Sequence, residues 1–317
     1  MKSHFFSLLF YVLAMSVLCA LIAWGKPFQV VGMFVVSGMA VGSLYALGGI
    51  GLVVLYRATG VLNFTSGAIG AFAVMLAWQL GQWGVPAVMT WLAAMLAAIT
   101  LSLTYGRLIA PGLAWREPVV KAIATLGFAL IILGMTAFIW DDDVRKFSLP
   151  SDKQAIMVMG LRVTVTRLIV ILAAIILVIG IWLYLGKTRM GLQMRALAND
   201  RNLSALIGIR ILKAETIAWA IAGVIAGFTG LMFGDLIRLE PVVITFLVIP
   251  SIAAAICGRL DNLVQVLLGG LTMGVIESLL TLQPALKDIR PIAPFVIAAL
   301  ALLWMQRGKQ LLFARDN

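Results

Sequence analysis

The chain has 317 residues, of which 62% are hydrophobic and only 12% are charged. A water-soluble core of this size cannot bury so much apolar surface, so we expect most of the chain to lie in lipid. The net charge of +11 does not indicate nucleic-acid binding, because the basic residues are spread over many short loops, as in membrane proteins.

Residues that usually carry catalysis or bind metals are scarce. Cys19 and Cys257 lie far apart in apolar runs, and His4 is the only histidine, so no disulfide framework or metal site is indicated. GKT at 186–188 resembles the end of a phosphate-binding loop, but Ile181 stands where that motif needs glycine. We therefore expect no catalytic residues, no metal and no cofactor on this chain, and no intramembrane enzyme.

Apolar runs long enough to cross a bilayer follow one another along the chain. They predict an all-α polytopic membrane protein with about nine or ten transmembrane helices in a single permease domain over residues 1–317. The expected spans are 5–25, 28–56, 63–80, 87–106, 119–140, 168–186, 216–234, 242–258, 263–283 and 289–305.

The first two spans each pose a question. Span 5–25 has a basic start like a signal peptide, but its apolar stretch is long and no clean cleavage site follows, which favours a retained helix. Span 28–56 is too long for one straight helix, and we expect it to tilt or break at its glycines. These glycines are Gly32, Gly38, Gly42, Gly48, Gly49 and Gly51.

Orientation follows from the lysines and arginines on alternate loops. Of 24 such residues, 15 fall on the set that includes both termini and the loop 187–215, and 9 fall on the set that includes 141–167. Cytoplasmic loops carry the excess of positive charge. We therefore expect both termini and 187–215 in the cytoplasm, with 141–167 outside.

The stretch NFTSG opens a helix after Gly60. Exposed N–H groups at such a break suit a carboxylate or an amide carbonyl, and the two hydroxyls can donate or accept hydrogen bonds. The alternative is an ordinary helix cap at the membrane interface. The candidate path residues here are Asn63, Phe64, Thr65, Ser66 and Gly67.

Glu277 is an ionisable residue deep in the ninth span. Such a residue is costly in lipid and usually faces protein or water. It is either a gate or path residue or one partner of a helix–helix hydrogen bond. Nearby, Gly269, Gly270 and Gly274 predict close helix packing.

Residues 187–215 form one long polar, basic stretch between apolar spans. GLQMRALAN has the spacing of a helix, and Asn199 or Asp200 is expected to cap a second short helix, RNLSALI, which Gly208 ends. Two interpretations remain open from these residues alone. The helices lie on anionic lipid, or they dock a cytoplasmic partner.

Three separated motifs resemble those of the permease subunits of branched-chain amino acid ABC importers, over about residues 35–310. GLQMRALANDRNLSALIGI is similar to that family's cytoplasmic coupling segment, while GSLYALGG followed by NFTSG, and LLGGLTMGVIESLL, resemble two others. Thr65 and Ser66 depart from the family's usual pair. The matched coupling residues are Gly191, Arg195, Ala196, Asp200, Ser204, Gly208 and Ile209.

The resemblance implies a substrate path in the bacterial plasma (inner) membrane, driven by other chains. Implied partners are a second related permease, two ATP-binding subunits that hold ATP and Mg, and a periplasmic or extracellular solute-binding protein. Branched-chain or related amino acids are the leading solutes. The atypical segment CGRLDNLVQ at 257–265 leaves urea, amides or small organic acids open. An ion-driven secondary transporter is the rival, with Glu277 as its only candidate coupling residue.

Overall fold

The computed structural model describes residues 25–306, except positions 142, 159, 238, 284–289 and 291. The predicted helix at 5–25 lies outside the described residues. Within them the chain is almost entirely helical, as the sequence predicts. The helices are α2 (Phe28–Thr59), α3 (Thr65–Gln82), α4 (Ala87–Thr104), α5 (Pro118–Trp140), α6 (Val165–Lys187), α7 (Arg189–Asn199), α8 (Arg201–Leu206), α9 (Ile211–Leu236), α10 (Pro241–Phe246), α11 (Val248–Cys257), α12 (Leu263–Leu280) and α13 (Ala293–Gln306).

Six of the described helices are long and apolar enough to cross a bilayer: α2, α4, α5, α6, α9 and α12. Helix α4 continues to Leu113 through a π-helical turn and a 3₁₀ turn. Helix α3 has 18 residues, and α13 covers most of the predicted last span. These helices match the predicted spans closely and confirm an all-α polytopic membrane protein.

Helix α2 runs its whole length without a break, so of the two outcomes expected for this glycine-rich span, a tilt or a break, the break does not occur. Its 32 residues extend roughly 48 Å, farther than an apolar layer of about 30 Å, so the helix must tilt or protrude. The glycines allow close packing instead. A Cβ on Gly38 would lie 2.6 Å from the Val275 Cα, and one on Gly42 would lie 2.6 Å from the Gly270 carbonyl oxygen. The predicted close packing of the α12 glycines is thereby confirmed.

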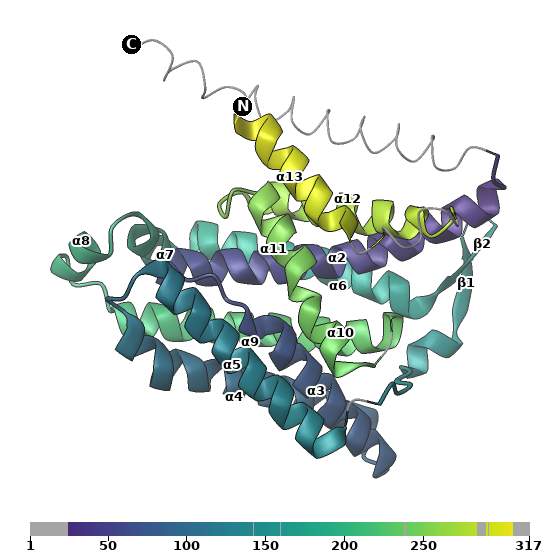
Figure 1. Cartoon of the computed structure of the whole chain (residues 1–317), viewed down its shortest axis with the longest axis horizontal. Coiled ribbons are helices and arrows are strands. Elements are labelled where there is room, and N and C mark those ends of the chain that lie inside the picture. Colours follow the sequence, from purple (N-terminus) through teal and green to yellow (C-terminus); the bar gives the residue numbers. More distant parts are fainter. Residues whose placement is uncertain are drawn as a thin grey trace.

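The predicted span 242–258 is not one helix. It forms α10 and then α11, with Leu247 between them. Pro250 supplies the reason, because it has no N–H to give the carbonyl of Phe246 and its ring would collide with that carbonyl in a continuous helix. In the first turn of α11 the missing donor is harmless. The result is a bend inside the bundle (Figure 1).

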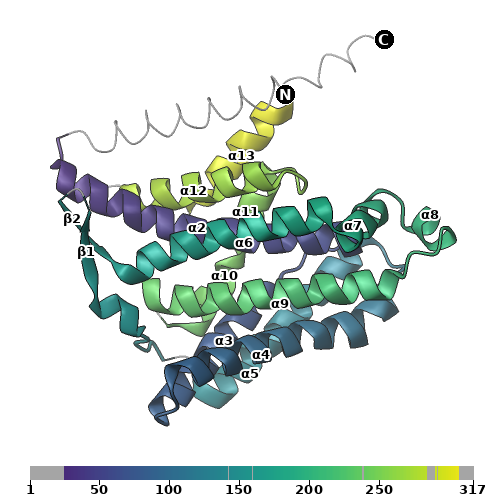
Figure 2. The ribbon, with the colours of Figure 1, turned by 180° about the vertical axis from the view of Figure 1, so that it is seen from behind.

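The two ends of the bundle differ. Strands β1 (Ala155–Val158) and β2 (Leu161–Thr164) form an antiparallel hairpin in the loop 141–167, which the sequence analysis did not predict. The hairpin lies at one end of the bundle, and α7 and α8 lie at the opposite end (Figures 1 and 2). In chain order the helices alternate between these ends, as expected for a membrane bundle.

The core lies around α2 and α9, where Leu44, Ile50 and Trp219 are fully buried. Helices α4, α5 and α6 present large apolar side chains outward instead, including Phe138 of α5, which is 90% exposed. Such outward apolar faces contact lipid or another membrane chain. The exposed apolar surface therefore agrees with a lipid-embedded fold.

Candidate functional site

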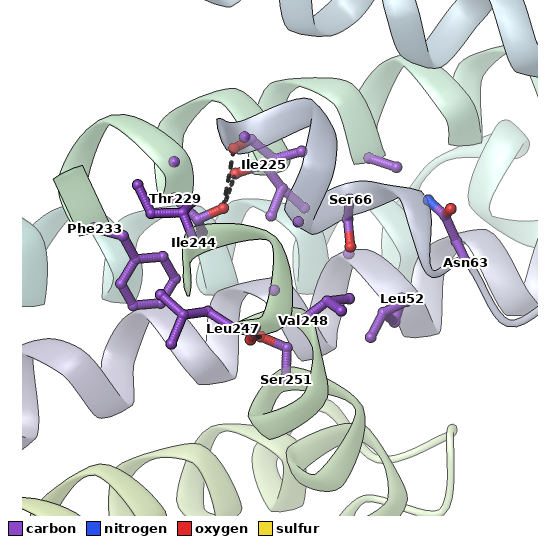
Figure 3. A pocket seen from close by; sticks show the side chains of 17 residues that line it. Leu52, Asn63, Ser66, Ile225, Thr229, Phe233, Ile244, Leu247, Val248 and Ser251 are labelled. Atoms are coloured by element: carbon purple, nitrogen blue, oxygen red, sulfur yellow. Dashed lines mark hydrogen bonds between the residues drawn. The ribbon is translucent and has the colours of Figure 1, made fainter. Parts of the chain in front are cut away.

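A narrow pocket, with a cavity volume of about 20 Å³, lies where α2, α3 and α9 meet the bend between α10 and α11 (Figure 3). Backbone comes close on several sides because glycines line it, among them Gly48, Gly51 and Gly230. Polar groups come from Asn63, Ser66, Thr229 and Ser251, and apolar groups from Leu52, Phe233 and Val248. The pocket has the mixed lining that small-molecule sites show.

Close backbone contacts build this pocket. The Cα of Gly67 packs against the backbone of Thr245 in α10 so tightly that any Cβ would overlap it. A Cβ on Gly70 would lie 2.8 Å from the Ala226 carbonyl oxygen, so α3 also touches the backbone of α9. Gly81, near the other end of α3, has open space around it. The glycines at the start of α3 therefore set the pocket's shape.

The predicted path residues divide between two sides of the α3 start. Asn63, Ser66 and Gly67 line the pocket, and Ser66 points into it (Figure 3). Asn63 is only 2% exposed, and its Oδ1 accepts a hydrogen bond from the Thr65 backbone N–H at 2.9 Å. Phe64 lies instead in a separate apolar pocket beside α5. Asn63 therefore accepts the first N–H of α3, and three members of the motif line a cavity.

Thr125 of α5 holds the start of α3, and the sequence analysis missed it. Its backbone carbonyl accepts a hydrogen bond from the Thr65 hydroxyl at 3.1 Å, so Thr65 faces α5 and not the pocket. The Thr125 hydroxyl accepts from the Phe64 N–H at 3.2 Å. The sequence alone does not show this role, because a threonine in an apolar helix does not stand out. The role follows only from the contact between residues that are 60 positions apart.

Glu277 is not part of the pocket around Asn63. Its two carboxylate oxygens accept hydrogen bonds from the Tyr45 hydroxyl at 2.9 Å and from Arg290 Nε at 3.0 Å. It lines a separate cavity toward the hairpin end of the bundle. The structure thus identifies the helix–helix partner of Glu277 and separates this residue from the other predicted path residues.

The segment that was predicted to form two short helices does so in α7 and α8. Asp200, and not Asn199, caps α8, since its Oδ1 accepts from the Leu203 N–H at 2.9 Å. Gly208 ends the segment with a φ of +80°. Thr188 Oγ1 accepts from the Gly191 N–H at 3.0 Å. The GKT tripeptide is thus a helix end followed by a cap.

The remaining predicted coupling residues lie in the same surface segment. Arg195 is exposed, and Ala196 and Ile209 are half-buried. Ser204 is buried and donates a hydrogen bond to the Asp200 carbonyl at 2.7 Å. A Cβ on Gly191 would collide with the end of α6. The structure therefore brings all seven residues together, with some facing outward and others fixing the fold of the segment.

Helix α8 exposes apolar side chains although the segment around it is polar. Leu206 is 84% exposed and Ile207 is 66% exposed, and Leu203 is exposed beside them. We call Leu203, Leu206 and Ile207 the α8 apolar tip. Figures 1 and 2 show α8 projecting at the end of the bundle. An apolar tip on a projecting helix is typical of a binding surface.

An ion pair that the sequence analysis missed ties α8 to the bundle. Arg201 contacts Glu215 at 2.5 Å, and Glu215 is buried in the first turns of α9. The Arg201 guanidinium also lies 6.0 Å from the Trp115 ring. The signal in the sequence was an acidic residue just inside an apolar span, which needs a partner.

The atypical segment 257–265 has a structural role. Asn262 caps α12, because its Oδ1 accepts from the Val264 N–H at 3.1 Å and from the Gln265 N–H at 3.3 Å. Asp261 forms an ion pair with Arg57 at the end of α2. These polar residues join α12 to α2 at the α7 end of the bundle. They do not line the pocket around Asn63.

A bundle of apolar helices around a pocket at a helix break, with a projecting segment at one end, defines a multi-pass membrane permease. Residues 34–304 match the family described as "Branched-chain amino acid transport system / permease component", and the chain belongs to this family. It is a permease subunit of the importer type that the sequence motifs resemble. An ion-driven carrier is not favoured.

Curated relatives agree along most of the chain. It is 26% identical to the high-affinity branched-chain amino acid transport system permease protein BraD of Pseudomonas aeruginosa, covering 77% of this chain and 84% of the relative. It is 24% identical to the high-affinity branched-chain amino acid transport system permease protein LivH of Escherichia coli, covering 86% of this chain and 92% of the relative. Among solved structures, PsaBC from Streptococcus pneumoniae in complex with Fab gives a TM-score of 0.47 at 12% identity. The match covers 90% of this chain and 93% of that chain.

Proposed function

We propose that this chain forms the membrane path of an ATP-driven importer for branched-chain or related amino acids in the bacterial inner membrane. A second permease, two ATP-binding subunits and an external solute-binding protein complete the importer. ATP and Mg bind the partner subunits, and this chain performs no chemistry. Its α7–α8 end faces the cytoplasm and its hairpin end faces outward, in agreement with the lysine and arginine distribution.

The observation that carries this proposal is the α8 apolar tip, on a short helix that polar contacts hold in place. Asp200 and Ser204 stabilise the segment, and Arg201 anchors it to Glu215. A helix that merely lay on anionic lipid would present basic residues beside its apolar face, whereas the one basic residue within α8, Arg201, is paired with Glu215. Here the apolar tip projects from the bundle and is suited to a groove of an ATPase subunit.

The pocket around Asn63 is the proposed substrate position within the membrane. Ser66 presents a hydroxyl to it, and the bend between α10 and α11 forms the facing wall (Figure 3). Broken helices at membrane depth are where transporters bind solutes. Movement of α8 by the ATPase would pass through Arg201 and Glu215 to α9, which lines the same pocket.

The test is reconstitution of the purified complex in proteoliposomes, with radiolabelled leucine as the solute. Uptake should require ATP, the ATPase subunits and the binding protein, and it should persist when ionophores collapse the proton and sodium gradients. Leu206→Asp, which places a charge in the apolar tip, should lower this uptake. Asn202→Ala, on the same helix but outside the apolar tip, is the control and should not. Leucine uptake that proceeds without ATP and stops with the ionophores would refute the proposal.

A further inference from the structure

A second cavity, with a volume of about 400 Å³, lies toward the hairpin end of the bundle between α2, α6, α9 and α12. We call it the outer pocket. Three charged side chains line it: Arg167, Glu277 and Arg290. Hydroxyls of Ser37 and Thr281 add polar lining. Along α2, this cavity is farther from α7 and α8 than the pocket around Asn63 is.

Among the described residues, two guanidinium groups and one carboxylate line the outer pocket. Both oxygens of Glu277 are engaged, one by Tyr45 and the other by Arg290 Nε. Within the described residues, no hydrogen bond occupies the outer guanidinium nitrogens of Arg290. Arg167 Nε is buried and has no hydrogen-bond partner in the described part of the chain. Two guanidinium groups therefore line a cavity in which the one carboxylate among the described residues already accepts two hydrogen bonds.

Asp235 is the other acid near Arg167. It lies within electrostatic range of Arg167, but its Oδ1 accepts from the Leu149 N–H at 2.7 Å, and it does not line the outer pocket. Its Oδ2 is buried without a hydrogen bond from the described residues. Arg167 and Asp235 thus offset each other's charge at a distance, without a hydrogen bond between them among the described residues.

The outer pocket stands in series with the pocket around Asn63. Tyr45 is buried between them: its hydroxyl donates to Glu277, and its ring packs on Phe233 with centroids 5.7 Å apart. Phe233 lines the pocket around Asn63. A solute that entered at the hairpin end would therefore meet the two arginines first and the Tyr45–Phe233 pair next.

We propose that the outer pocket binds the carboxylate of the solute between the guanidinium groups of Arg167 and Arg290, so that the importer takes carboxylate-bearing solutes and not urea or neutral amides. This inference rests on the proposed function, which sets the hairpin end outside. A guanidinium presents planar, paired donors that match a carboxylate. The urea and amide alternatives lack the negative charge that two arginines would stabilise.

The experiment compares Arg167→Gln with Arg162→Gln in the assembled complex. Arg162 is an exposed arginine at the same end of the bundle and outside the outer pocket. With binding protein saturating, Arg167→Gln should lower ATP-driven leucine uptake roughly tenfold or more, the loss expected for one charge-assisted contact. Arg162→Gln should stay within about twofold. Co-purification of the ATPase subunits should be unchanged in both.

The double variant Arg167→Gln with Asp235→Asn separates binding from folding. If Arg167 only neutralises Asp235, the double variant recovers uptake; if it binds the carboxylate, uptake stays low. Wild-type uptake from Arg167→Gln, or recovery in the double variant, would overturn the inference and leave the proposed function intact. Wild-type complex that shows no ATP-driven uptake of leucine would instead refute the proposed function.

Discussion

The α7–α8 segment and the pocket around Asn63 place polar and apolar groups in opposite ways. In the segment, Asp200 and Thr188 cap the local backbone, while the α8 apolar tip projects outward. In the pocket, Ser66 faces a cavity, and tightly packed glycine backbone forms the walls. The first region thus exposes apolar side chains, and the second encloses polar ones. This difference is the basis of our proposal that the segment docks an ATPase subunit and that the pocket lies on the solute path.

The largest effect should come from Gly67→Val, which attacks the pocket and spares the segment. The new side chain must displace the Thr245 backbone, and overpacking of that kind costs about 1–3 kcal/mol or more. We expect ATP-driven uptake to fall at least roughly a hundredfold, since the pocket wall moves. Gly81→Val, with open space around it in the same helix, should leave uptake unchanged. An equal loss of uptake in both variants would mean that the close contact of Gly67 with Thr245 is not what transport depends on.

The next effect should come from Asp200→Ala, which attacks the segment and spares the pocket. Loss of the cap costs about 1 kcal/mol and frees α8 to fray. ATP hydrolysis should continue while uptake per ATP falls, by roughly fivefold at that free energy. Asp200→Asn keeps the acceptor oxygen and should keep coupling. Should the asparagine variant fail as badly as the alanine variant, the charge of Asp200 and not its cap would matter.

A smaller effect is expected at Tyr45, which lies between the pocket and the outer pocket. Tyr45→Phe removes one hydrogen bond to a charged carboxylate, a loss of about 1.5–3 kcal/mol. The purified protein should unfold a few degrees lower in a thermal ramp. Tyr56→Phe, in the same helix, is the control, because no hydrogen bond of its hydroxyl ties it to another described helix. An unchanged midpoint for Tyr45→Phe would contradict the assigned bond.

The smallest effects distinguish the two roles within the α3 start. Thr65→Val removes a buried hydrogen bond to Thr125 and should lower stability by about 1 kcal/mol with the pocket intact. Ser66→Ala removes a hydroxyl that faces the cavity and should lower uptake about two- to fivefold without changing the melting temperature. Paired melting curves and uptake rates check this. The reverse assignment of the two effects would break the distinction between cap and path.

Local features were predictable from the sequence, because caps and helix ends depend on neighbouring residues. Asp200 and Gly208 mark the bounds of α8 in the sequence itself, and the positions of most apolar spans follow from hydropathy alone. The bend between α10 and α11 could also have been predicted from the sequence, since Pro250 indicates it. The prediction overlooked that signal because the apolar run is continuous.

Contacts between distant residues were not predictable in the same way. The 60 residues between Thr65 and Thr125, and the 232 between Tyr45 and Glu277, leave no local pattern. The sequence did not decide what the glycines of α2 do, because glycine favours both breaks and close packing, and only the neighbouring α12 backbone decides between them. The partners of Glu277, which are Tyr45 and Arg290, could not be predicted for the same reason.

The most direct measurement of the central claim is photo-crosslinking from the α8 apolar tip in native membranes. A photo-crosslinking amino acid in place of Leu206 should join this chain to an ATP-binding subunit, identified by mass spectrometry. The same amino acid in place of Leu130, an exposed apolar residue of α5, should not. Crosslinks from both positions to lipid alone would contradict the account, because the α7–α8 segment would then be a membrane-surface helix and not the site where the ATPase docks.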